Sequence, residues 1–170
     1  MGAIAEQSTV GAGGIGGQRG AVRMHVPLGY RSCQLTSIGM LNHVMVGSND
    51  IARSRAFYDA VLGGVLGAPA PLVNQAGSGH TRLFYRHAGS TFCVSEPIND
   101  APSTCGNGTT VGFACDSPEQ VQAFHAAAVA AGGTSIEDPP GRRESTLGPA
   151  WLAYVRDPDG NKLCAIHRPG

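Results

Sequence analysis

An internal repeat constrains the fold of this chain more than any other feature of its sequence. The segment LNHVMVGSNDIARSRAFYDAVLGG (residues 41–64) is echoed by a second segment after a shift of 67 residues. The shift pairs Val44 with Val111 and Phe57 with Phe124, so a strand, a turn and a helix return in the same order. Self-similarity at a fixed period indicates a repeated supersecondary unit. The sequence therefore predicts two copies of one unit.

Each copy begins with a short strand. In LNHVMVG, alternation places Val44 and Val46 on one face and His43 and Met45 on the other. An amphipathic helix follows, capped by Asn49 or Asp50, with residues at the spacing of one helical stripe. These stripe residues are Ile51, Ser54, Phe57, Tyr58, Val61 and Leu62.

Two β-rich runs complete each copy. In the first, TRLFYRH (81–87) and STFCVSEP (90–97) flank Ala88-Gly89, which is typical of a hairpin. In the second, WLAYVRD (151–157) and KLCAIHR (162–168) flank a turn containing Asp-Gly. The polar run 137–149 is expected to be a long loop.

The second copy opens with the strand TTVGFAC (109–115), and its helix starts at Ser117-Pro118, with Gln120 closing a capping box. We expect an α+β fold of two βαβββ modules, which together form a single domain over residues 40–170. Module one spans 41–97, a turn-rich linker spans 98–108 and module two spans 109–168.

Residues 1–39 differ from the rest, because the first twenty are rich in glycine and almost free of large apolar side chains. Such a segment cannot bury enough surface to offset its ordering entropy, so we expect it to be disordered or extended. Its composition, with several arginines and a single acidic residue, faintly resembles that of a transit peptide. Met40 directly precedes the first strand, so we expect an extended start or plain disorder rather than a targeting segment.

Charge and cysteine content exclude several classes of protein. Lysine plus arginine equals aspartate plus glutamate at 12 each, so no nucleic-acid partner is expected. No apolar run reaches the length of a membrane helix, so no membrane partner is expected. The five cysteines form no C-x-x-C pair. They fit reduced thiols in the cytoplasm better than a disulfide framework.

The repeat, the helix ending FYDAVLG and the terminal DPDGN hairpin together resemble the vicinal oxygen chelate superfamily of glyoxalase-like lyases, bleomycin resistance proteins and extradiol dioxygenases. The matching features cover Leu41 to Arg168. This resemblance implies that each module curls into half of a cup and that the paired modules hold a small ligand, usually over a divalent metal. It also implies a homodimer.

The resemblance places metal ligands on the first and last strands of each module. Carried over by position, His43 matches the first histidine, whereas Thr110 replaces the second and Cys164 replaces a glutamate. On the last strand of module one the residues facing the cup would be Cys93 and Ser95. The usual hard donor set is therefore largely missing. We expect either no metal or a soft zinc site formed by His43, Cys93 and Cys164.

Two functions remain open at this stage. In the first, the protein is a glyoxalase-like lyase or dioxygenase relative, with His43 as base or ligand and Tyr154 as a polar anchor. In the second, it is a drug-sequestering protein that encloses an aromatic or apolar compound without catalysis. In both, the expected ligand contacts are Met45, Cys93, Thr110, Arg143 and Trp151.

Overall fold

The structure, a computed structural model, describes residues 40–170. The expectation for residues 1–39 lies outside the described residues. Module one contains β1 (Val44–Gly47), α1 (Ile51–Tyr58), the π-helical turn η1 (Asp59–Gly63), β2 (Leu72–Gln75), β3 (Thr81–His87) and β4 (Ser90–Ser95). Module two contains β5 (Val111–Ala114), α2 (Pro118–Ala130), β6 (Thr134–Arg143), β7 (Ala150–Arg156) and β8 (Lys162–His167).

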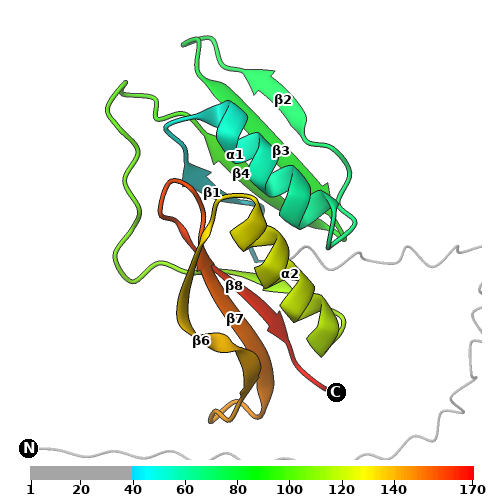
Figure 1. Cartoon of the computed structure of the whole chain (residues 1–170). Coiled ribbons are helices and arrows are strands. Elements are labelled where there is room, and N and C mark those ends of the chain that lie inside the picture. The colour runs from blue at the N-terminus through cyan, green and yellow to red at the C-terminus, as the bar shows by residue number, and fades with distance from the viewer. Residues whose placement is uncertain (1–39) are drawn as a thin grey trace, which may run out of the picture. The chain divides into compact units, whose positions relative to one another are not determined.

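The two modules have the same topology. Their sheets have the strand orders β1-β4-β3-β2 and β5-β8-β7-β6, with one parallel pair in each, β1 with β4 and β5 with β8. Figure 1 shows α1 covering the first sheet and α2 covering the second. The first strands begin at Val44 and Val111, which are 67 residues apart. This confirms the α+β fold of two βαβββ modules.

Local sequence explains where both helices begin. The Asp50 carboxylate caps α1 by accepting from the Arg53 backbone N–H at 3.0 Å. Ser117 caps α2 by accepting from the backbone N–H of Gln120, and Pro118 occupies the first turn. The Gln120 side-chain oxygen accepts from the backbone N–H of Asp116 at 2.6 Å. The capping contact therefore reaches one residue further back than the sequence pattern predicts.

One apolar core joins the modules. Phe57 and Phe124, which the repeat pairs, are both fully buried in it. Tyr58 lies 4.9 Å from Phe92 between ring centroids, and Phe92 lies 5.3 Å from Phe113 of the other module. Aromatic rings in such tilted and edge arrangements attract one another beyond their area burial. The stripe expected for the first helix thus packs against residues of both modules.

The hairpin between β7 and β8 ties module two to module one. The side chain of Asp159 is only 1% exposed and accepts hydrogen bonds from the Asn49 backbone N–H, Ser54 Oγ and Arg53 Nη2 at 2.8–3.0 Å. Asp157 accepts from the buried hydroxyl of Tyr58 at 2.7 Å. The DPDGN turn therefore also connects the two modules, and we call residues 157–161 the joint hairpin.

Two segments differ from the sequence-based expectation. The prediction of a loop over 137–149 is wrong for its first half, because β6 extends to Arg143. The register between β6 and β7 shifts between Ile136 and Gly141, which lets the strand pass Pro139 and Pro140 although neither has an N–H for the ladder. In module one, β2 is the first of the three strands after the helix, and the sequence pattern did not locate it.

None of the helices among residues 40–170 is long and apolar enough to cross a membrane.

Gly133, just after α2, lies close to neighbouring backbone and to the apolar core. A Cβ there would lie 2.8 Å from the carbonyl oxygens of Ala128 and Arg156 and 2.9 Å from the ring of Phe57. We expect Gly133→Ala to lower the free energy of unfolding by about 1–3 kcal/mol through overpacking. Urea unfolding followed by circular dichroism measures the change. Gly77→Ala, where a Cβ meets open space, is the control and should change stability little.

Candidate functional site

A pocket of about 430 Å³ lies in the seam between the two modules. We call it the seam pocket. Its apolar wall is contributed by Leu66, Phe92, Val111 and Phe113, and His43 lies among its polar residues. Small-molecule sites are usually concave and largely apolar, with a few polar groups that fix orientation. The seam pocket has this composition.

An asymmetry between the two modules explains why the seam is open on this side. The joint hairpin, with residues 157–161 between β7 and β8, inserts its carboxylates against the start of α1. Only Ala88 and Gly89 separate β3 from β4 in module one. This shorter hairpin lines the seam pocket together with the end of β5 and the start of α2. The shorter turn carries no equivalent of the inserted carboxylates.

Polar side chains at the seam pocket are held by their neighbours. His43 lies directly before β1 and is exposed, and its Nδ1 lies 2.9 Å from Asn42 Oδ1. That contact leaves Nε2 as the ring nitrogen able to meet a ligand. The amide of Gln120 is fixed at both ends, since its Nε2 donates to the Val65 carbonyl at 3.0 Å while its Oε1 accepts from Asp116. Sequence analysis assigned Gln120 to capping alone and missed its place in the pocket wall.

The face of each sheet opposite its helix carries most of the other expected site residues. We call it the helix-free face. In module one, Met45 and Cys93 are paired in register across β1 and β4. Met45 is 42% exposed, whereas Cys93 is fully buried. Burial raises the pKa of the Cys93 thiol, and the nearby Arg86 opposes this shift. Cys93 is therefore protonated at neutral pH.

In module two, Tyr154 and Cys164 are direct neighbours across β7 and β8. Burial raises the pKa of both groups. Both therefore keep their protons at neutral pH, so Tyr154 can donate a hydrogen bond and Cys164 is not a thiolate. Lys162 Nζ lies over the Tyr154 ring at 4.6 Å from its centroid.

The remaining expected contacts lie elsewhere. Thr110 lines a separate hollow with Arg156 and Lys162. Trp151 packs against the apolar core, because it has the same strand parity as the buried Ala153. Arg143 donates to the Pro139 carbonyl of its own strand at 2.8 Å.

The residues of the expected zinc site do not form one within a single chain. Among residues 40–170, no three histidine, cysteine, aspartate or glutamate side chains come together in a way that could hold a metal ion. Within the part of the chain that the structure describes, His43, Cys93 and Cys164 therefore do not form the expected zinc site.

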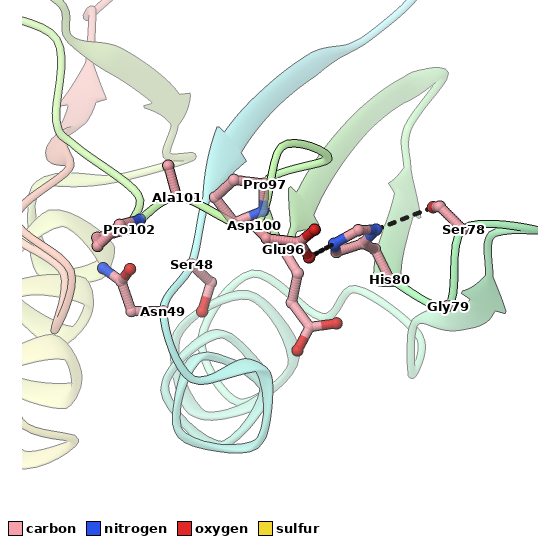
Figure 2. A pocket seen from close by; sticks show the side chains of 10 residues that line it. All are labelled: Ser48, Asn49, Ser78, Gly79, His80, Glu96, Pro97, Asp100, Ala101 and Pro102. Carbon is pink, nitrogen blue, oxygen red and sulfur yellow. Dashed lines mark hydrogen bonds and ion pairs between the residues drawn. The ribbon is translucent and has the colours of Figure 1, made fainter.

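A second hollow, of about 500 Å³, is polar and is shown in Figure 2. His80 lies between Ser78 Oγ and Asp100 Oδ1, each 2.9 Å from one ring nitrogen. Glu96 also lines it, and Figure 2 shows its side chain directed away from the His80 pair. Through these two contacts His80 holds the β2–β3 turn to the linker. Because both of its ring nitrogens are engaged, we do not assign the ligand site to this hollow.

The fold and the seam pocket define a class, the α+β proteins built from paired βαβββ modules. The sequence model of the Glyoxalase/Bleomycin resistance protein/Dioxygenase superfamily matches residues 40–165. The chain belongs to this superfamily, which confirms the family expected from the sequence.

Solved structures agree with this assignment. A glyoxalase/bleomycin resistance protein from Albidiferax ferrireducens T118 is 53% identical, with a TM-score of 0.71 over 76% of this chain and 100% of that chain. A glyoxalase-related enzyme from Fulvimarina pelagi is 20% identical, with a TM-score of 0.58 over 76% of this chain and 88% of that one.

A V278E glyoxalase I mutant from Zea mays is 19% identical, with a TM-score of 0.59 over 75% of this chain and 45% of that one. At such low identity, the Fulvimarina and Zea similarities show the fold alone. No curated protein matches the chain.

Proposed function

We propose that the protein binds a small oxygenated or aromatic molecule in the seam pocket, between its two modules. The observation that carries this proposal is the apolar pocket of about 430 Å³ with the His43 imidazole among its lining. Aromatic rings of Phe92 and Phe113 offer stacking surfaces, and His43 Nε2 offers one polar contact to a ligand oxygen. Retention of the compound without reaction, as in a drug-sequestering protein, needs nothing more.

A glyoxalase-like lyase is the second candidate. It is supported by His43, because imidazole is the side chain that most often serves as a general base. Tyr154, which keeps its proton at neutral pH, would be a polar anchor for the substrate. It would act either from the helix-free face of the same chain or from a second subunit. Turnover of a hemithioacetal, measured with chelator and then with added Zn²⁺, Mn²⁺ or Ni²⁺, separates this candidate from pure binding. Turnover that His43→Ala abolishes would favour the lyase.

We further propose that the protein is a cytoplasmic homodimer. On edge strand β2, Leu72 and Val73 are 57% and 55% exposed, and a second copy of the chain would cover them. Four cysteines in residues 40–170, namely Cys93, Cys105, Cys115 and Cys164, are free thiols, as suits a reducing compartment. Light scattering after size-exclusion chromatography tests the dimer, and a monomeric mass at micromolar concentration would contradict it.

Blocking the seam pocket tests the proposed binding. Gly112 lines the pocket on the exposed side of β5, and a Cβ there meets no atom within 4 Å, so Gly112→Leu should narrow the mouth of the pocket without straining β5. We expect 1-naphthol to shift the amide resonances of Gly112 and Phe113 in wild type. The variant should bind 1-naphthol at least tenfold more weakly, since the leucine side chain obstructs entry to the pocket.

Gly77→Leu is the matched control, because Gly77 also has open space but lies outside the pocket. It should bind 1-naphthol like the wild type, and both variants should keep the wild-type melting temperature within a few degrees. Equal affinity in wild type and Gly112→Leu would show that the seam pocket is not the binding site.

A further inference from the structure

A third hollow, of about 510 Å³, lies between the helix-free face of module one and the segment that leads into module two. We call it the linker pocket. Arg82 and Ser95 lie in its wall, and Met45 and Ile98 give it an apolar rim, 42% and 69% exposed. It shares no lining residue with the seam pocket. It is therefore a separate candidate site.

The segment over this pocket is fixed by paired hydrogen bonds. The Asn49 side chain accepts from the Ser103 backbone N–H at 2.6 Å and donates to the Ser103 carbonyl at 3.2 Å. Ser103 lies so close to Gly47 that a Cβ on Gly47 would approach its Oγ to 2.2 Å. A side chain at Gly47 would force the Ser103 hydroxyl to move. The linker pocket is therefore formed before any ligand arrives.

Arg82 is the unusual residue of this pocket. Its Nε is buried and has no hydrogen-bond partner within residues 40–170. Burying such a donor without a partner is unfavourable, so native proteins nearly always satisfy it. The nearby Glu96 does not do so, because its Oε2 accepts from the Thr81 backbone N–H at 2.6 Å and no ion pair joins it to Arg82 in this part of the chain.

We propose that the linker pocket binds a small organic monocarboxylate, with the carboxylate on Arg82 and the apolar body against Met45 and Ile98. A guanidinium presents a planar fork of donors that matches a carboxylate. Because Nε is buried, the carboxylate would meet the terminal Nη groups of Arg82, which form no ion pair within residues 40–170. The apolar rim suits an aromatic or aliphatic body. Glu96 places a negative charge in the same pocket, which disfavours a dianion such as phosphate relative to a monoanion.

Titration with sodium benzoate, followed by NMR of the full chain, tests this proposal. We expect benzoate to shift the resonances of Met45 and Ile98 with a millimolar dissociation constant, and benzamide, its neutral analogue, to shift them little. Arg82→Gln should weaken benzoate binding at least tenfold. Met45→Ala, which leaves Arg82 intact, should weaken it severalfold.

Arg86→Gln is the matched control, because Arg86 lies four residues along the same strand on the same face and is exposed. It should bind benzoate within twofold of the wild type, and Gly112→Leu should also bind normally, which separates this site from the seam pocket. Three results would overturn the proposal: no benzoate binding by the wild type at 20 mM, equal losses in the Arg82 and Arg86 variants, or tighter binding of inorganic phosphate than of benzoate.

Discussion

Replacing Asp159 with alanine is expected to lower the free energy of unfolding by about 3 kcal/mol. Asp159 has a side chain that is 1% exposed and accepts hydrogen bonds from Asn49, Arg53 and Ser54. Removing one member of a buried, charge-assisted network leaves the other members without partners, which costs about 3–5 kcal/mol when the pair is fully buried. Arg53 is 47% exposed, so we place the effect at the lower end of that range. Urea unfolding at pH 7 measures it.

The same carboxylate should make stability depend on pH in the acid range. Burial of Asp159 would raise its pKa, but hydrogen bonds from Asn49 and Ser54 and the charge of Arg53 outweigh burial and lower it below 3.8. A folded pKa below the unfolded value stabilises the protein fully above the unfolded pKa. That contribution is lost as the pH falls through the lower, folded pKa. The stability gap between wild type and Asp159→Asn should therefore be constant from pH 7 to pH 5 and shrink below about pH 4.

Asp138→Ala is the control for both measurements. Asp138 is 83% exposed at its side chain and lies 3.8 Å from Arg143, so its removal should change stability by about 0–1 kcal/mol. An Asp159→Ala effect as small as this would show that the joint hairpin does not hold the two modules together.

Truncating either repeat-related phenylalanine should destabilise the protein by a similar, large amount. Phe57 and Phe124 are both fully buried in the shared core. Phenylalanine to alanine in a core costs about 3–5 kcal/mol, from lost transfer free energy and from the cavity left behind. Because a small domain has a total stability of about 5–15 kcal/mol, the alanine variants should melt far below the wild type. Scanning calorimetry measures the shift.

Milder variants keep this prediction measurable if the alanine variants fail to fold. The leucine variants Phe57→Leu and Phe124→Leu should also be destabilised, and by similar amounts. Each loss should be smaller than in the alanine variant, since leucine keeps most of the side-chain volume. Val129 in α2 is 43% exposed, so Val129→Ala should change the free energy of unfolding by less than about 0.5 kcal/mol. A large loss at only one of the two phenylalanines would contradict their equivalence in the repeat.

The sequence by itself determined the repeat, both helices, most of the strands and the buried face of the first helix. These features depend on residues close together in the chain: the spacing of Phe57, Tyr58 and Val61 along a helix, the glycine of a tight hairpin, and a period of 67 residues. Periodicity and turn chemistry are local, so they can be read without knowledge of distant contacts. The capping of α1 and α2 was predictable for the same reason.

The tertiary structure decided which features belong to a site. The contact of Asp159 with Asn49 joins residues 110 positions apart, so a turn motif gives no sign of it. The seam pocket lies beside the short β3–β4 hairpin, whose difference from the β7–β8 hairpin involves segments far apart in the sequence. The unpartnered Nε of Arg82 depends on where Glu96 and Thr81 lie. Residues 137–143, predicted as part of a polar loop, belong instead to strand β6, which is held by pairing with β7. Hydrogen bonding and burial between distant segments are properties of the folded chain, and here they alone separate a structural side chain from one that can meet a ligand.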